Sequence, residues 1–284
     1  MSEAAPTLES LIRHGAAALA AAGIAEPRRE AWRVWAGLTG ESGGSAWLRR
    51  EAPVAGPARE RFERAIARRA RGEPLAYVTG QAGFRRLTVR VDRRALIPRP
   101  ETEGLVDLVL ARQPTGVAVD VGTGSGCLAL ALADEGRYRL VIGIERSRAA
   151  LALARENVAA TGLRVALVAG DLVEACGTCL ADVVVANPPY VAEDEYATLD
   201  AGVREWEPAA ALVSGPDGLE ATRRLLPGAL RVVRPGGWLA LEVDLRRAGD
   251  VARLATAAGW RDATVHLDLF GRARYVLARR SEAE

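Results

Sequence analysis

The feature that most constrains the fold of this chain is a regular alternation of short apolar runs with longer helical runs after residue 101. Apolar runs that are not alternating are typical of strands covered on both faces. Strands that alternate with helices predict an α/β fold with a doubly wound, mainly parallel sheet. The expected strands lie at 117–121, 139–145, 164–171, 181–187 and 238–243, and two closing antiparallel strands lie within 263–280. The sheet is therefore expected to have seven strands.

The first part of the chain has a different pattern. Residues 7–70 are rich in Ala, Arg and Leu, and Gly and Pro mark the ends of helical runs, which predicts a small helical domain. Residues 75–97 then include an alternating stretch, "RLTVRVD", which predicts a β-hairpin connector. We expect a small helical core from six residues: Trp32, Trp35, Trp47, Leu48, Phe62 and Ile66.

A glycine-rich loop, "DVGTGSG", links the first of these strands to the next helix. Gly122, Gly124 and Gly126 permit a tight turn and a close backbone approach to a ligand, with Thr123 and Ser125 between them. Glu145 ends the next strand, where a doubly wound fold holds an acid for ribose hydroxyls. Asp171 ends the third strand, and Asp171 and Leu172 are expected beside an adenine, although Asp171 alternatively caps a helix or turn.

Two adenosine cofactors compete for this loop. NAD usually accompanies G-x-G-x-x-G. The loop here is G-x-G-x-G, which resembles the glycine motif of class I S-adenosylmethionine methyltransferases. In that case Asp120 would lie near the sulfonium end of the cofactor.

A second candidate site, "VVVANPPYV", follows the fourth strand. Asn187 emerges at the same carboxyl edge of the sheet as the glycine loop. Pro188 and Pro189 fix the backbone and remove two N–H donors, so the loop offers acceptors: the Asn187 amide oxygen and a carbonyl, expected to be that of Pro188. A planar NH2 group needs such acceptors, and Tyr190 is expected to pack on its flat face. The loop predicts methyl transfer to an amide or amino nitrogen, with no metal.

Composition removes several alternatives. The net charge is +2, and all 38 basic residues are Arg, so chemistry that needs a lysine is excluded. Near-balanced charge argues against stable nucleic-acid binding through charge alone.

The sequence has neither an apolar run long enough for a membrane helix nor a signal peptide at its start, so we expect a cytoplasmic protein without membrane contact. Cys176 and Cys179 form one C-x-x-C pair, which we interpret as two loop thiols.

The Asn-Pro-Pro-Tyr tetrapeptide resembles the motif of methyltransferases that act on planar NH2 groups in adenine, cytosine or protein glutamine. Three further stretches, "GEPLAYVTGQAGF", "LIPRPETEGLVD" and "DLFGRARYVLARR", are similar to the release factor glutamine N(5)-methyltransferases, the PrmC/HemK family. The resemblance covers residues 72–280. It implies a helical docking domain (1–74), a hairpin linker (75–97) and a methyltransferase domain (98–284).

The resemblance implies a reaction and its participants. The cofactor is S-adenosyl-L-methionine, the product S-adenosyl-L-homocysteine, and the substrate the Gln of the Gly-Gly-Gln motif in class I peptide-chain release factors. The glycine loop, Glu145, Leu172 and Asn187 would contact the cofactor, and 187–190 would hold the target glutamine. Arg99, Thr102 and Glu103 would close over the methionine end. Asp244 departs from the family, which usually has Gly at this position.

Two other functions remain as hypotheses from the sequence. An adenine or cytosine amino-methyltransferase needs a basic surface or a recognition insert, and the chain has no long insert after Tyr190. A cofactor-binding module without activity would leave the rigid Asn187 loop unexplained.

Overall fold

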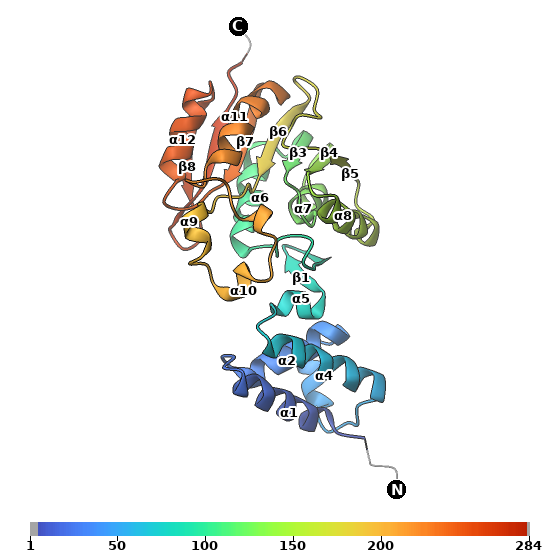
Figure 1. Cartoon of the computed structure of the whole chain (residues 1–284). Coiled ribbons are helices and arrows are strands. Elements are labelled where there is room, and N and C mark those ends of the chain that lie inside the picture. Colours follow the sequence, from blue (N-terminus) through green and yellow to red (C-terminus); the bar gives the residue numbers. More distant parts are fainter. Residues whose placement is uncertain (1–4, 283–284) are drawn as a thin grey trace. The chain divides into compact units, whose positions relative to one another are not determined.

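The computed structural model describes residues 5–282. The chain forms two compact units, one of residues 5–81 with 201–206 and the other of residues 82–200 with 207–282 (Figure 1). Within the described residues, no helix is long and apolar enough to cross a membrane.

The first unit is helical because its apolar residues recur at helical spacing and its helix starts are marked by caps or prolines. Thr7 accepts a hydrogen bond from the Ser10 N–H at the first helix start, and Pro27 occupies the first turn of the second helix. Leu8, Ile12 and Phe62 are among its fully buried side chains. The helices are α1 (Leu8–Ala21), α2 (Pro27–Thr39), α3 (Gly43–Leu48), α4 (Gly56–Ala70), α5 (Leu75–Thr79) and α10 (Ala201–Arg204).

The predicted core of this unit is only partly correct. Trp35, Phe62 and Ile66 are buried, and Trp32 is partly buried. Trp47 and Leu48 were expected there but are 47% and 84% exposed, so that expectation is wrong for both. They end the short helix α3, and the ring centroid of Trp47 lies 6.0 Å from that of the partly buried Trp32.

The connector contains both a helix and a hairpin. Residues 75–79 form α5, and β1 (Gln81–Phe84) and β2 (Leu87–Arg90) form a two-stranded sheet. Arg85 lies in the turn with a positive φ of 55°. Its guanidinium pairs with Glu135 and Asp107, so the turn is held by ion pairs within the second unit, to which all three residues belong.

The second unit is built on one seven-stranded sheet with the order β5-β4-β3-β6-β7-β9-β8. The first five strands in this order are parallel to one another, and β9 is antiparallel to both β7 and β8. The predicted doubly wound, mainly parallel sheet is therefore confirmed. The strands are β3 (Thr115–Val121), β4 (Arg137–Glu145), β5 (Val165–Ala169), β6 (Ala181–Ala186), β7 (Val233–Glu242), β8 (Arg261–Leu267) and β9 (Ala273–Arg279).

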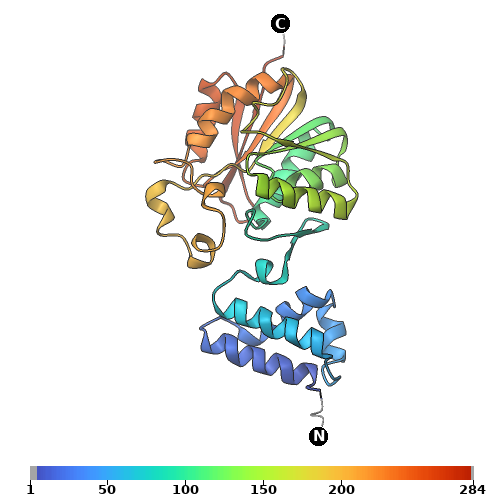
Figure 2. The same ribbon diagram turned by 45° about the vertical axis from the view of Figure 1, so that its right-hand side comes forward.

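Helices cover both faces of the sheet, as Figures 1 and 2 show. Helices α6 (Pro100–Arg112) and α7 (Cys127–Glu135) pack on one face, where Ala118 and Val183 are buried. Helices α11 (Glu220–Val232) and α12 (Ala248–Ala257) pack on the other, against Val119, Val184 and Leu239. This two-sided cover explains the continuous apolar character of the central strands.

The order of the strands reverses between β3 and β6, since β4 and β5 lie to one side of β3 and β6 and β7 to the other. In the register of this pair, Val121 is opposite Ala186. The next residues, Gly122 and Asn187, therefore leave the sheet at the same level. Such a reversal opens a crevice at the carboxyl ends of the strands, where ligands bind in this class of fold.

Candidate active site

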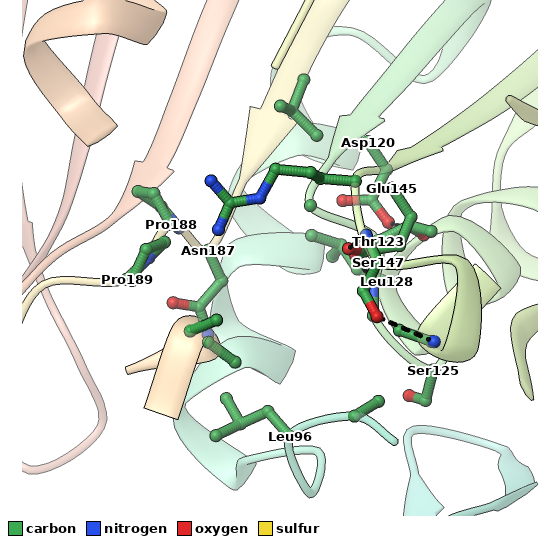
Figure 3. Close-up of a pocket in the computed structure, with 18 of the residues that line it drawn as sticks. Leu96, Asp120, Thr123, Ser125, Leu128, Glu145, Ser147, Asn187, Pro188 and Pro189 are labelled. Atoms are coloured by element: carbon green, nitrogen blue, oxygen red, sulfur yellow. Dashed lines mark hydrogen bonds between the residues drawn. The ribbon is translucent and has the colours of Figure 1, made fainter. Parts of the chain in front are cut away.

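A cavity of about 380 Å³ lies at this reversal point. Its walls include eleven of the thirteen residues that the sequence singled out for the two sites: Asp120, Gly122, Thr123, Gly124, Ser125, Glu145, Asp171, Leu172, Asn187, Pro188 and Pro189. Figure 3 shows Asn187 and the two prolines on one side of the cavity and Thr123, Glu145 and Ser147 on the other. Gly126 and Tyr190, which the sequence also assigned to the site, are not among the lining residues.

The glycine loop has the conformation that its sequence requires. Gly122 and Gly124 have φ of +73° and +58°, in the left-handed region that favours glycine. A Cβ built on Gly122 would meet no atom within 4 Å, so the missing side chain leaves room beside the backbone for a ligand. Gly126 instead caps the start of α7, which explains its place outside the cavity.

Asp120 holds this loop from beneath. Its buried carboxylate accepts hydrogen bonds from Thr123 Oγ1 (2.5 Å) and from the Ala129 N–H (3.1 Å) in the first turn of α7. Burial raises the pKa of Asp120 to about 7, against the lowering effect of these two hydrogen bonds. The carboxylate thus fixes the turn between β3 and α7.

Glu145 lies at the end of β4, beside the loop, as the pattern predicted. Its carboxylate accepts a hydrogen bond from the Gly124 N–H at 2.9 Å and another from the Ser147 N–H at 2.7 Å. Each carboxylate oxygen can accept further hydrogen bonds. Glu145 can therefore hold the loop and also bind a hydroxyl group in the cavity.

Asp171 and Leu172 line the cavity beyond β5. Arg224 Nη2 donates to Asp171 Oδ2 at 2.5 Å, which ties the loop after β5 to helix α11. Leu172 has a φ of +49°, a conformation that is uncommon for a branched residue and that turns this loop beside the cavity.

The loop after β6 gives the cavity its opposite wall. Pro188 and Pro189 have no N–H group, so their backbone offers acceptors only. Tyr190 follows the two prolines in the chain, and burial, followed by the charge of Glu242, raises the pKa of its phenol to about 12. The phenol is therefore neutral over the range in which proteins function. The predicted packing of Tyr190 on a substrate stays a prediction.

Two buried side chains, Thr102 and Glu242, form a hydrogen-bonded chain behind the partly buried Asn187, and the sequence did not predict it. Asn187 Nδ2 donates to Thr102 Oγ1 at 3.2 Å, and Thr102 Oγ1 donates to Glu242 Oε2 at 2.7 Å. Thr102 and Glu242 are 4% and 1% exposed. Glu242 is the last residue of β7, as Glu145 is of β4. An acid at the end of a strand was therefore the sequence feature that could have identified Glu242 as a site residue.

The start of α6 and the residues just before it supply another part of the wall. Arg99 and Thr102 line the cavity, and Arg99 pairs with the buried Glu207 at 2.6 Å. Glu207 also accepts the Ile97 N–H at 3.1 Å. Glu103 was expected beside them, but it is outside the lining residues and accepts the Arg85 N–H at 3.0 Å.

Two other features of the sequence have structural explanations. Cys176 is buried and Cys179 exposed, both as free thiols, and residues 5–282 contain no cluster of acids, His and Cys able to hold a metal ion. Asp244 accepts the Arg246 N–H at 2.9 Å and forms ion pairs with Arg246 and Arg247. Both arginines also pair with Glu195 of α9 (Glu193–Tyr196), so Asp244 belongs to a charge network that joins two loops.

The sheet order, the glycine loop after β3 and the acid at the end of β4 define a class I methyltransferase fold. Residues 102–206 match the family described as "Methyltransferase small domain", and residues 10–80 match "PrmC N-terminal domain". A methyltransferase structure from Pyrococcus furiosus shares this fold, with a TM-score of 0.52 and 20% identity over 68% of this chain and 88% of that one.

Two curated relatives are similar over nearly the whole chain, and both carry the name release factor glutamine methyltransferase. The protein from Cereibacter sphaeroides is 42% identical over 92% of this chain and 94% of its own length. The protein from Moorella thermoacetica is 41% identical over 97% and 99%. The chain belongs to the release factor glutamine methyltransferase family.

Proposed function

We propose that this enzyme transfers a methyl group from S-adenosylmethionine to the side-chain amide nitrogen of a glutamine, the Gln of the Gly-Gly-Gln motif in class I peptide-chain release factors. The observation that carries the proposal is the acceptor-only wall beside the glycine loop: Asn187 is held through its NH2 group, and the two prolines that follow have no N–H. The names of the curated relatives support the same substrate.

The residues of the cavity fit this cofactor. Gly122 leaves open space where a side chain would stand, which suits a close approach of the methionine part. Glu145 has acceptor capacity for ribose hydroxyls, and Asp171 and Leu172 line the end expected for adenine. No lysine is available for a phosphate, and S-adenosylmethionine has none. When bound, it supplies an electrophilic methyl group on sulfur.

The chain's own contribution is to orient the nitrogen that is methylated. The Asn187 Oδ1 atom accepts no hydrogen bond within residues 5–282, so it is available to accept one N–H of the substrate amide. The Pro188 carbonyl would accept the second. Two acceptors on these protons fix the amide plane and stabilise the positive charge that grows on nitrogen.

The predicted docking role of the helical unit and the predicted cytoplasmic location belong to the same proposal. Residues 10–80 match a domain described for this family, and we expect them to contact the release factor. Release factors act on ribosomes, so the enzyme would meet its substrate in the cytoplasm.

The test uses the purified chain with radiolabelled S-adenosylmethionine. Three candidates are offered separately: a class I release factor, the same factor with Ala in place of the Gln of Gly-Gly-Gln, and a mixture of DNA and RNA. We expect label only on the intact factor, on the peptide that contains Gly-Gly-Gln. Label on nucleic acid instead would favour an adenine or cytosine amino-methyltransferase and overturn the proposal.

A further inference from the structure

We propose that Thr102 and Glu242 are positioning residues that turn the amide oxygen of Asn187 toward the substrate, and that they do so only while Glu242 is ionised. The proposal rests on the proposed function, because it concerns the group that would accept the substrate N–H. It stands on the two hydrogen bonds that join Asn187, Thr102 and Glu242.

The direction of these hydrogen bonds follows from the chemistry of the three groups. An ionised carboxylate can only accept, so Thr102 must give its single hydroxyl proton to Glu242. The Thr102 oxygen can then only accept from Asn187, and the Asn187 group facing it must be NH2. The amide oxygen is left on the other side. A carboxylate buried behind the wall thus decides which end of the Asn187 amide faces the cavity.

Protonation of Glu242 removes this constraint. A carboxylic acid can donate its O–H to the Thr102 oxygen, and the Thr102 proton is then free to bond the oxygen of a flipped Asn187 amide. The Asn187 NH2 group would then face the substrate NH2 group, donor against donor. The flip breaks and forms hydrogen bonds only, and the carboxylic acid takes its proton from solvent. A protonated Glu242 therefore defines an inactive arrangement.

The surroundings of Glu242 set the range over which this change occurs. Burial raises its pKa to about 7. Thr102, Arg274 on β9 and Arg99 before α6 oppose this shift, and Glu101 on α6 adds to it. Burial raises the pKa values of three neutral groups around it, and the charge of Glu242 adds to each shift: Tyr190, Tyr275 on β9 and Cys127 on α7. Burial also raises the pKa of Asp120, whose charge acts on Cys127 as well, to about 7, so the pH profile of Glu242→Gln is needed to separate the two carboxyl groups.

The test compares kcat, KM and cofactor affinity across pH 5.5 to 9 for the wild type and three variants, with a class I release factor as substrate. Thr102→Ser keeps the hydroxyl and is the matched control. Thr102→Val keeps the shape but breaks the chain, and Glu242→Gln removes the titration. Calorimetry with S-adenosylhomocysteine shows whether each variant still binds cofactor and is folded.

We expect wild-type kcat to fall below an apparent pKa near 7, and Thr102→Ser to follow the same profile. Thr102→Val should lose about tenfold or more in kcat at pH 8, as expected for an acceptor that is no longer held in place, with little change in cofactor affinity. In Thr102→Val and Glu242→Gln the fall in kcat at low pH should become weaker. The inference would be overturned if both variants kept the wild-type kcat, or if both kept the wild-type fall in kcat at low pH.

A spectroscopic measurement tests the coupling between Glu242 and Asn187 without relying on activity. The side-chain NH2 resonance of Asn187, assigned by its loss in Asn187→Ala, should shift between pH 6 and 8 in the wild type and stay constant in Glu242→Gln. A constant resonance in the wild type would contradict the inference. If the wild type does not methylate the release factor at all, the proposed function fails, and the resonance still tests the coupling.

Discussion

The side chain of Asn157 on α8 (Arg148–Thr161) binds the carbonyl of Ser125, so a buried helix residue holds the glycine loop from below. The Nδ2–O distance is 2.8 Å. Asn157 also accepts the Arg90 N–H at 2.7 Å and donates to the Arg90 carbonyl at 3.0 Å. One amide therefore links the loop after β3 to the hairpin strand β2.

We expect Asn157→Ala to lower the free energy of unfolding by about 2–3 kcal/mol, because it removes the partner of the buried Ser125 carbonyl and of two partly buried backbone groups of Arg90. It should also weaken cofactor binding, since the loop loses an anchor. Denaturant unfolding and calorimetry measure the two effects. Arg155→Ala, at an exposed position on the same helix, is the control and should change neither. Equal stability of the two variants would contradict the linking role.

Asn157 also shows what the sequence does not reveal. An Asn within an amphipathic helix gives no indication of its partners, which lie 67 and 32 residues away and meet it only in the folded chain. The same is true of the hydrogen-bonded chain behind Asn187. Thr102 is 85 residues from Asn187 and 140 residues from Glu242 in the sequence. Buried networks of this kind depend on which strands are neighbours. The sequence predicted a doubly wound, mainly parallel sheet but not the order of its strands.

The strands and the two loops were predictable because each depends on local sequence. Central parallel strands are apolar throughout, and glycines and prolines restrict the backbone at the residues where they stand. The burial of Trp47 and Leu48 was predicted wrongly, since helical spacing does not tell whether a short helix lies at the edge of a core. The order of β3 and β6 is what brings the two predicted loops together.

Asn187→Ala should leave cofactor binding nearly unchanged and lower kcat by about 100-fold or more, because a positioned group that stabilises developing charge is lost. Steady-state rates with a release factor, together with calorimetry for S-adenosylhomocysteine, separate the two effects. Turnover equal to that of the wild type would remove Asn187 from the mechanism.

Glu145→Ala should weaken cofactor binding by about 1–3 kcal/mol through the loss of a charged hydrogen-bond partner. The carboxylate also holds the Gly124 N–H, so part of this loss would come from a looser loop. Glu145→Gln keeps one acceptor oxygen, so its cofactor affinity is expected to lie between those of the wild type and Glu145→Ala. Unchanged affinity of the Ala variant in calorimetry would refute a role in cofactor binding.

The double variant Cys176→Ser with Cys179→Ser should keep wild-type activity, because both cysteines are free thiols and neither lines the cavity. Cys176 is buried, so a small fall in melting temperature is expected there. Activity and thermal unfolding are measured with and without a chelator. A large loss of activity, or a metal signal in the wild type only, would show that the thiols have a role we have not assigned.

Glu242→Gln should make the second unit more stable at pH 8 than the wild type. Burial raises the pKa of Glu242 from 4.5 to about 7, so the folded state binds this proton more tightly than the unfolded state. The contribution of Glu242 to stability is then greatest below pH 4.5 and falls as the pH rises to about 7. Asp120 titrates in the same range but is present in both proteins. Thermal unfolding at pH 5 and pH 8 should show an advantage of the variant only at pH 8.

Gly104→Ala on α6 should destabilise the protein by about 1–3 kcal/mol, the usual range for overpacking. Alanine normally favours a helix interior by about 1 kcal/mol over glycine. Here its Cβ would clash with the Tyr275 hydroxyl oxygen and lie 3.0 Å from the ring carbon Cζ. That hydroxyl donates to the Glu101 carbonyl at 2.5 Å, beside Thr102, so activity should fall as well.

The matched control is Gly249→Ala on α12, where a Cβ meets nothing within 4 Å and the change should be neutral or stabilising. Adding Tyr275→Phe to Gly104→Ala should restore part of the stability, because it removes the oxygen but leaves the ring carbon. Urea unfolding of the single and double variants gives these differences directly. If Gly104→Ala stabilised the protein as much as Gly249→Ala, the close packing of α6 on Tyr275 would not govern this position.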